Sequence, residues 1–268
     1  MIWDNRFEKI RHFGDRETFD MKSIVIIPAR YASTRLPRKL LLSETGKPLL
    51  QYTYEAALKA TLPESVCVAC DHHEIFEMVQ GFGGTVFMTD PEARSGTDRI
   101  AEVAARMEDI DIVVNVQGDE PEISSDSIDL VVRMLVDSPG AVMSTLCTPI
   151  RNRGQLEDPA CVKTVFDKSG RALYFSRSVI PHPRGGIRDE MFDADPSLFY
   201  QHIGMYAYRR DFLLSLAQLP AAEIEKTESL EQLRVLWHGY DIMVGVVDEP
   251  TFGIDTPEDY RRFVEKQR

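Results

Sequence analysis

Short apolar runs alternate with longer amphipathic stretches through the first half of the chain. Strands are predicted at residues 23–27, 65–69, 85–87, 111–116 and 141–146. Helices are predicted between them, at residues 48–60, 73–80, 97–107 and 125–136. Strands that alternate with helices are typical of an α/β domain whose mostly parallel sheet has helices on both faces. Ligands bind such sheets at the carboxyl ends of the strands.

The second half of the chain is richer in strands and turns. Residues 162–166 and 171–175 predict a hairpin around a Lys-Ser-Gly turn at 168–170. Residues 184–197 are rich in Gly and Asp and predict a loop, and strands follow at 200–208 and 241–247. We therefore predict one domain over residues 21–268, with a small β-rich portion at 150–210 added to a mixed central sheet.

Two helices are predicted near the C-terminus. Residues 226–238 carry Leu230, Leu233 and Trp237 at the spacing of a core-facing stripe, and Gly239 would end this helix. The dipeptide Thr256-Pro257 predicts the start of the last helix, with Thr256 as its N-cap and proline in its first turn.

Composition indicates a globular protein that is not embedded in a membrane. Of the 268 residues, 43% are hydrophobic, enough to form a substantial core. The apolar runs are strand-sized, well short of the roughly 20 residues that cross a bilayer. Residues 1–20 are polar with scattered aromatics and lack a signal-peptide pattern. They predict a disordered or loosely packed extension, or a start codon assigned too early, since Met21 directly precedes the first strand. We expect a cytoplasmic protein.

The overall charge is strongly acidic. Forty-three acidic against 31 basic residues give a formal net charge of −12. Nucleic acid is not expected as a partner, because binding its phosphates requires a basic surface. Against this background a local cluster of basic residues is informative.

Cys67 and Cys70 form a C-x-x-C pair that permits two interpretations. Such pairs can bind metal or carry out redox chemistry. This one lies in an alternating, strand-like segment and no second C-x-x-C follows it. We therefore favour two small buried core residues.

The loop after the first strand concentrates positive charge. It carries Arg30, Arg35, Arg38 and Lys39, and no acidic residue occurs between positions 21 and 43. Transfer of a nucleotidyl group needs such charges, because negative charge builds up on the leaving pyrophosphate. The loop lacks a Walker A pattern, so side chains would hold the phosphates. The alternative is an exposed basic loop that binds nothing.

Two acidic residues are candidates for a metal site. Asp119 follows the apolar run 111–116 within a Gly-Asp-Glu-Pro turn, and Asp255 precedes the Thr256 cap of the last helix. Mg²⁺ favours one or two carboxylates together with phosphate oxygens, so the pair could form a two-carboxylate site. Each could instead be an ordinary acidic residue at a turn or helix start.

Six motifs in order resemble one family, the 3-deoxy-manno-octulosonate (KDO) cytidylyltransferases, from about residue 21 to the C-terminus. The motifs are 27–37 (IPARYASTRLP), 95–99 (SGTDR), 115–121 (NVQGDEP), 172–177 (ALYFSR), 230–234 (LEQLR) and 255–259 (DTPED). The resemblance implies transfer of CMP from CTP to KDO with release of pyrophosphate, for lipopolysaccharide synthesis. It also implies Mg²⁺, a fold similar to the nucleotide-diphosphosugar transferases, and a homodimer built partly by the 150–210 portion.

The resemblance further implies roles for individual residues. The catalytic set is Lys39, Arg30, Arg35, Asp119 and Asp255, with the two aspartates as metal ligands. The nucleotide-binding set is Pro28, Ala29, Arg30, Lys39, Ser95, Thr97 and Gln117. The sugar-binding set is Arg177, His202, Tyr206, Glu228 and Gln232, with Arg177 on the KDO carboxylate because a guanidinium binds carboxylates bidentately.

The sugar-side residues also permit structural interpretations. Arg177 could form a structural ion pair, and His202 and Tyr206 could be core residues of the strand at 200–208. Glu228 and Gln232, four residues apart on a predicted helix, could simply bond to each other.

The chain departs from the family pattern at a few positions. Arg38 stands where glycine is usual, Glu122 where an apolar residue is usual, and His182 where tryptophan is frequent. These differences leave open an 8-amino form of KDO or a nonulosonic acid as the acceptor. A non-catalytic nucleotide-binding module is a further alternative, which the presence of Asp119 and Asp255 beside Lys39 disfavours.

Overall fold

The computed structural model describes residues 21–248 and 252–268, so the prediction for residues 1–20 falls outside the described part. The strands are β1 (Ser23–Ala29), β2 (Ser65–Cys70), β3 (Val86–Met88), β4 (Ile112–Asn115), β5 (Ala141–Pro149), β6 (Lys163–Phe166), β7 (Ala172–Ser176), β8 (Tyr200–Arg209) and β9 (Asp241–Val246). The α-helices are α1 (Leu49–Ala57), α2 (His73–Gly81), α3 (Gly96–Ala104), α4 (Ser125–Asp137), α5 (Arg153–Glu157), α6 (Arg210–Leu216), α7 (Glu223–Glu228), α8 (Gln232–Trp237) and α9 (Pro257–Lys266). Short 3₁₀ helices are η2 (Lys39–Leu41) and η3 (Asp189–Phe192).

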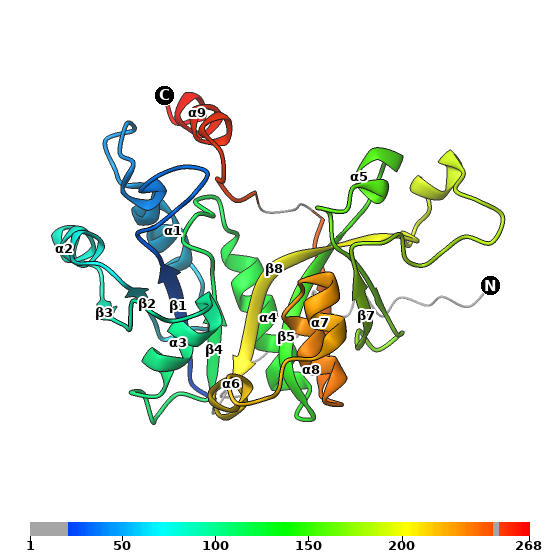
Figure 1. Ribbon diagram of the computed structural model, residues 1–268, viewed down its shortest axis with the longest axis horizontal. Coiled ribbons are helices and arrows are strands. Elements are labelled where there is room, and N and C mark those ends of the chain that lie inside the picture. The colour runs from blue at the N-terminus through cyan, green and yellow to red at the C-terminus, as the bar shows by residue number, and fades with distance from the viewer. Residues whose placement is uncertain (1–20, 249–251) are drawn as a thin grey trace.

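The described strands form one mixed sheet in the order β3-β2-β1-β4-β8-β5-β9 (Figure 1). Neighbouring strands are parallel except around β8, which runs antiparallel to both β4 and β5. The predicted hairpin β6–β7 is present and joins the sheet through the first residues of β8. The expected mixed, mostly parallel sheet is therefore confirmed, and β8 from the predicted β-rich portion is one of its central strands.

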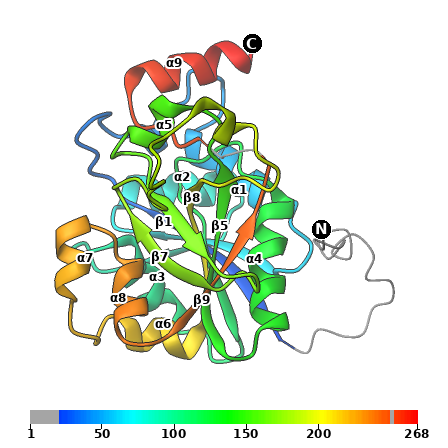
Figure 2. The ribbon, with the colours of Figure 1, turned by 90° about the vertical axis from the view of Figure 1, so that its right-hand side faces the viewer.

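Helices cover both faces of the sheet, as expected. Residues of α1, α2 and α4 pack in one hydrophobic cluster, and residues of α3, α6 and α8 in another. Figure 2 shows α4 on one side of the sheet and the group α6, α7 and α8 on the other. Between these layers β1 and β4 are buried along their whole length, because parallel strands covered on both faces are apolar on both faces.

The C-x-x-C pair belongs to this core. Cys67 and Cys70 lie on β2 with free thiols, Cys67 in one hydrophobic cluster and Cys70 in the other. Side chains three positions apart on a strand point to opposite faces, so the two sulfurs cannot share a metal or form a disulfide. Burial raises the pKa of Cys67 to about 12 and that of Cys70 to about 11. The interpretation as core residues is confirmed.

The helix predicted at 226–238 is wrong as a single element. It is divided into α7 and α8 at Ser229, whose φ of 51° is left-handed and cannot continue an α-helix. Leu230 and Leu233 are buried as predicted, but Trp237 is 61% exposed. Val235 is buried instead. Trp237 is the last residue of α8, a helix of less than two turns, so the predicted stripe does not continue to it.

Four short helices of the described chain were not predicted, and one of them is η2, at the end of the basic loop. α5 and α6 are too brief to show a clear period, and α6 follows β8 directly without a turn signal. η3 lies inside the segment 184–197, which was expected to be a loop throughout. In the described part of the chain, no helix combines the length and apolarity needed to cross a bilayer.

Candidate active site

A cavity of about 570 Å³ lies at the carboxyl ends of β1 and β4, where the sequence predicted the ligand site. Because these strands are parallel neighbours, the basic loop after β1 and the turn after β4 meet at one edge of the sheet. The residues lining it are Pro28, Arg30, Ala32, Ser33, Thr34, Arg35, Lys39, Leu40, Arg94, Ser95, Gly96, Gln117, Gly118, Asp119 and Asp255.

Close packing fixes the turn that carries Asp119. A Cβ atom on Gly118 would lie 3.2 Å from both the Leu50 side chain and the carbonyl oxygen of Pro28, so the site favours glycine. The Thr53 hydroxyl donates a hydrogen bond to the Gly118 carbonyl at 3.0 Å, which ties the turn to α1. The side chain of Asp119 is thereby directed into the cavity.

The C-terminal segment completes the site from a distant part of the sequence. The backbone N–H of Ile254 donates to the carbonyl of Asp119 at 2.9 Å. Ile254 is buried with Leu36 and with residues of α9, so apolar packing holds the segment in place. Thr256 caps α9 by accepting from the N–H of Asp259, as predicted, which leaves the Asp255 side chain directed elsewhere.

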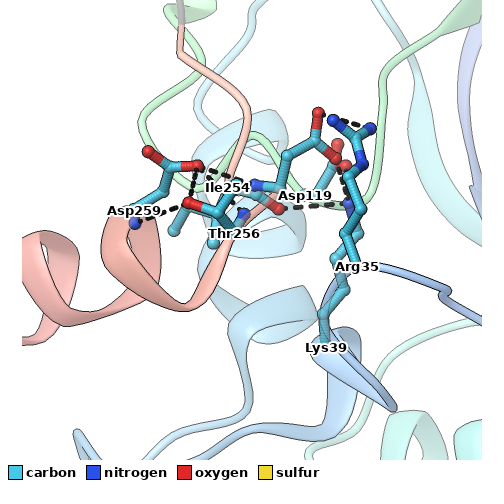
Figure 3. A network of polar contacts seen from close by, with 7 residues as sticks. Arg35, Lys39, Asp119, Ile254, Thr256 and Asp259 are labelled. Carbon is cyan, nitrogen blue, oxygen red and sulfur yellow. Dashed lines mark hydrogen bonds and ion pairs between the residues drawn. The ribbon is translucent and has the colours of Figure 1, made fainter.

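Asp119 and Asp255 converge on the ammonium group of Lys39, and Figure 3 shows Lys39 beside Asp119 and Arg35. Lys39 Nζ forms a short contact with Asp119 Oδ2, lies 2.9 Å from Asp255 Oδ1, and donates to the Ile254 carbonyl at 3.1 Å. Arg35 pairs with the other oxygen of Asp255, also at 2.9 Å. Burial by itself would lower the pKa of Lys39, but the two carboxylates outweigh it and raise this pKa above its usual value.

The donor pair fits a hard divalent cation. Asp119 and Asp255 present one oxygen each toward a single cationic atom, and carboxylate oxygens are the ligands that Mg²⁺ prefers. The described residues include no cluster of three or more His, Cys, Asp or Glu side chains suited to a metal. Since Mg²⁺ usually keeps water and substrate oxygens, two carboxylates suffice for a site shared with phosphates.

Most of the predicted nucleotide set lies around this cavity. Pro28, Arg30, Lys39, Ser95 and Gln117 line it. Ala29 does not, because it is fully buried as the last residue of β1. Thr97 is also buried and absent from the lining.

A residue outside the predicted sets accounts for the position of Thr97. That residue is Glu231. The Thr97 hydroxyl donates to Glu231 Oε2 at 2.7 Å, which links the first turn of α3 to the start of α8. Burial raises the pKa of the Glu231 carboxyl, although its bond to Thr97 opposes the shift. Glu231 lies within the 230–234 motif, which was a signal available in the sequence.

The start of the basic loop is held by contacts that the sequence analysis missed. Asp71, just after β2, accepts from the backbone N–H of Tyr31 at 2.8 Å and pairs with Arg99 at 3.3 Å. The Arg99 side chain is 1% exposed, and it also donates to the Asp90 carbonyl. Tyr31 stacks on His72 with ring centroids 3.7 Å apart. These contacts join the basic loop to the start of α2 beside the cavity. Arg99 belongs to the 95–99 motif, so the sequence did contain a signal for this contact.

The basic loop after β1 also shows why the family pattern has glycine at the position of Arg38. Arg38 has a φ of 54°, a left-handed conformation that glycine adopts without strain. Its guanidinium lies 5.1 Å from the centre of the Tyr31 ring and 3.6 Å from Glu74. These contacts offset part of the backbone strain while keeping the charge near the cavity.

The predicted sugar set lies apart from the lining of this cavity, near β7, β8 and the α7–α8 break. The guanidinium of Arg177 donates to the backbone carbonyls of Pro159, Glu228 and Ser229. The Glu228 carboxylate accepts from the Ser176 hydroxyl at 2.6 Å and from the N–H of Arg177 at 2.9 Å. The role of Arg177 on a substrate carboxylate therefore stays a prediction.

Gln232 and Glu228 do not share a helical face, so a simple pair between them is wrong. Ser229 separates their helices. The Gln232 side chain is buried, and its amide nitrogen has no hydrogen-bond partner within the described residues. A buried amide donor without a partner is a candidate for contact with a ligand.

His202 is a buried neutral imidazole. Burial lowers its pKa to about 3, and Nε2 lies 2.9 Å from Thr145 Oγ1. The Thr145 hydroxyl also faces the carbonyls of Ile203 and Met205, so its one hydrogen goes to a carbonyl and it accepts from His202. His202 thus carries its proton on Nε2. Tyr206 packs beside it, and burial raises the pKa of the Tyr206 hydroxyl.

Comparisons with known proteins give the family of this chain. The family profile described as Cytidylyltransferase matches residues 24–242. The 3-deoxy-manno-octulosonate cytidylyltransferase of Rhodopirellula baltica is 49% identical over 91% of this chain and 97% of its own length. That of Geobacter metallireducens is 47% identical over 92% of this chain and 98% of its own.

Solved structures give the same picture. CMP:2-keto-3-deoxy-manno-octonic acid synthetase complexed with CTP has a TM-score of 0.84 and 40% identity, covering 91% of this chain and 98% of the other. The 4-diphosphocytidyl-2C-methyl-D-erythritol synthase of Anaerococcus prevotii, at a TM-score of 0.61 and 13% identity, shares the fold alone; it covers 93% of this chain and 100% of the other. With its sheet, its motifs and the matched length in agreement, the chain belongs to the 3-deoxy-manno-octulosonate cytidylyltransferase family.

Proposed function

We propose that this protein transfers CMP from CTP to the anomeric hydroxyl of KDO and releases pyrophosphate. The observation that carries the proposal is the convergence of Asp119 and Asp255 on Lys39 in a cavity lined by Arg30 and Arg35. Such a cavity offers cations for a triphosphate and oxygens for a metal. Relatives at 47–49% identity are named for this reaction.

In this proposal the anomeric hydroxyl attacks the α-phosphorus of CTP. The new O–P bond replaces the bond to the β-phosphate, and pyrophosphate leaves. Arg30, Arg35 and Lys39 bind the phosphates and offset the negative charge that develops on the leaving group. Asp119 and Asp255 would hold Mg²⁺, which supplies further positive charge and favours the deprotonated hydroxyl. No covalent enzyme intermediate is needed.

The acceptor would lie on the side of Arg177, His202 and Gln232. His202 is neutral with its proton on Nε2, which makes Nδ1 a hydrogen-bond acceptor for a sugar hydroxyl. The buried amide nitrogen of Gln232 supplies a donor. For Arg177 to bind the KDO carboxylate, its guanidinium has to exchange carbonyl contacts for carboxylate contacts, which are stronger because both partners are charged.

Pyrophosphate release by the purified protein with Mg²⁺ and CTP tests the proposal. We expect release that depends on KDO and is lost with ATP in place of CTP or with EDTA. Release with 8-amino-KDO or a nonulosonic acid, but none with KDO, would retain the mechanism and change the acceptor. If no sugar acid supports release, the protein is not this enzyme, and CTP binding would then be measured.

We further propose a homodimer that resides in the cytoplasm. Among the named strands of the sheet β7 pairs only with β6, and Leu173 on β7 and Leu198 just before β8 are 56% and 47% exposed. An edge strand with exposed apolar side chains is suited to pairing with a second copy. The four free, buried cysteines fit a reducing compartment. Sedimentation equilibrium is expected to give twice the chain mass, and a Leu173→Lys variant is expected to give one chain mass.

A further inference from the structure

The Lys39 ammonium group is fully engaged at the point where the two acidic side chains converge. An ammonium has three N–H donors, and Lys39 Nζ has three acceptors: Asp119 Oδ2, Asp255 Oδ1 and the carbonyl oxygen of Ile254. The Lys39 side chain is only 14% exposed, against 22% and 41% for the two aspartates. A cation of the protein itself therefore occupies the proposed metal position.

From this geometry we propose that Lys39 competes with the divalent cation for Asp119 and Asp255 in the nucleotide-free protein. The inference rests on the proposed metal site and adds the condition under which a metal can bind there. A metal can reach both carboxylate oxygens only after the ammonium has moved, because two cations at one point repel each other strongly. The metal-binding strength of the free protein is therefore set by Lys39 as well as by the two aspartates.

Substrate phosphates would release the ammonium. Lys39 and Arg35 both lie on the cavity wall, and both are paired with Asp255 in the structure. Phosphate oxygens would offer Lys39 new acceptors of high negative charge, so that Asp119 and Asp255 become available to the metal. Metal and nucleotide would then bind together, each improving the affinity for the other.

Binding of Mn²⁺ without nucleotide tests the competition directly, with free Mn²⁺ measured by its electron paramagnetic resonance signal. We expect Lys39→Met to bind Mn²⁺ at least about tenfold more tightly than the wild type, because removal of the buried ammonium leaves the carboxylates uncompensated. The matched control is Arg35→Met. It removes the same charge from Asp255, but the Arg35 side chain is 66% exposed, so a gain below about threefold is expected.

Two more variants locate the effect and guard against misfolding. Asp119→Asn added to Lys39→Met is expected to abolish the gain, because one of the two ligands is lost. Lys39→Gln removes the charge while keeping a polar side chain, and its Mn²⁺ affinity is expected to rise as well. Thermal melting of each variant shows that the protein compared is folded.

The competition is overturned if Lys39→Met and Lys39→Gln, both folded, bind Mn²⁺ no more tightly than Arg35→Met. It is also overturned if the gain survives the loss of Asp119. These results are separate from the activity assay, since they are obtained without CTP or a sugar. KDO-dependent pyrophosphate release by the wild type, with no gain in Mn²⁺ affinity in Lys39→Met, would retain the proposed function and contradict the competition. A gain in Lys39→Met without KDO-dependent release by the wild type would retain the competition and contradict the proposed function.

Discussion

At the scale of single residues, the centre of the cavity is two carboxylates around one ammonium. Each group reaches this point from a different element: Asp119 from the turn after β4, Asp255 from the segment before α9, and Lys39 from η2. Together with the Arg35 guanidinium, which pairs with Asp255, the ammonium balances the two negative charges, so the acids remain close together without a ligand. Because both carboxylates share the Lys39 ammonium, the loss of one of them changes the charge around the other.

Asp119→Asn and Asp255→Asn are each expected to lower KDO-dependent pyrophosphate release by at least about 100-fold, since an amide keeps the shape but loses the charge that holds a metal. A coupled pyrophosphate assay measures the rate, and circular dichroism verifies the fold. Glu122→Gln is the matched control. Glu122 is an acid of the same segment whose partner is Lys266 at 2.5 Å, and near wild-type activity is expected. Wild-type rates in either aspartate variant would contradict the two-carboxylate site.

His202 should make the folded protein sensitive to mild acid. Its pKa falls from about 6.5 in the unfolded chain to about 3 when buried, so the unfolded state binds the extra proton first. Stability is therefore lost as pH falls through 6.5 toward 3. Between pH 7.5 and pH 5 the loss from this group is about 2 kcal/mol in the free energy of unfolding.

Urea unfolding at the two pH values measures this loss. His202→Asn removes the titrating group and should reduce the pH dependence by about the same 2 kcal/mol. His182→Asn, at an exposed position, should leave the pH dependence unchanged. Equal pH dependence in the wild type and His202→Asn would show that His202 is not held neutral by burial.

At the scale of elements, the break between α7 and α8 separates Glu228 from Gln232. Ser229 adopts a left-handed conformation, and Glu225 on α7 pairs with Arg234 on α8 across the break. The carbonyls of Glu228 and Ser229 accept from the guanidinium of Arg177. The break thus orients backbone acceptors toward a residue of the proposed acceptor side, which a continuous helix would not do, because its carbonyls bond within the helix.

Ser229→Gly is expected to raise the free energy of unfolding by about 0.5–1 kcal/mol, because glycine adopts this φ without a steric cost. Ser229→Val should lower it, since a β-branched residue is strained there. Chemical denaturation of the two variants measures the difference. A control is Ser169→Gly, in the β6–β7 turn beside a glycine of positive φ, where no gain is expected because Ser169 itself is not left-handed. Equal stability of the Gly and Val variants at 229 would contradict the assigned conformation.

At the scale of the whole molecule, the site depends on strands and segments that are distant in sequence. β8 enters the sheet between β4 and β5, and the segment before α9 returns to the turn after β4. Figure 1 shows α9 above the edge of the sheet near α1, and Leu49 of α1 is buried in one cluster with residues of α9. The architecture is therefore complete only when both ends of the described chain are in place.

A chain that begins at Met21 is expected to fold and to retain turnover within about twofold of the full chain. The family match begins at residue 24, and every lining residue of the cavity lies between Pro28 and Asp255. Melting temperature and KDO-dependent pyrophosphate release are the measurements. A chain that begins at residue 30 is the control. It lacks β1, which pairs with both β2 and β4, and is expected not to fold. Loss of folding on removal of residues 1–20 would contradict the prediction.

The sequence by itself determined the class of fold, the edge of the sheet at which the cavity lies, and the family. Apolar runs such as β1 and β4 are buried on both faces, so their composition predicts them without tertiary information. The cap at Thr256 and the hairpin β6–β7 depend on neighbours within a few residues, and local chemistry predicts such features well. Arg30 and Gln117, to which the family resemblance gives a role in nucleotide binding, line the cavity because they lie within two residues of the ends of β1 and β4.

Only the tertiary structure decided what each charged side chain contacts. Neither the break at Ser229 nor the exposure of Trp237 is visible in helical spacing, because packing against other elements determines both. The bond between Thr97 and Glu231 and the pairing of Arg99 with Asp71 join residues whose separation in sequence carries no distance information. The convergence of Asp119 and Asp255 on Lys39 is of the same kind, since it exists only where the folded sheet and α9 meet.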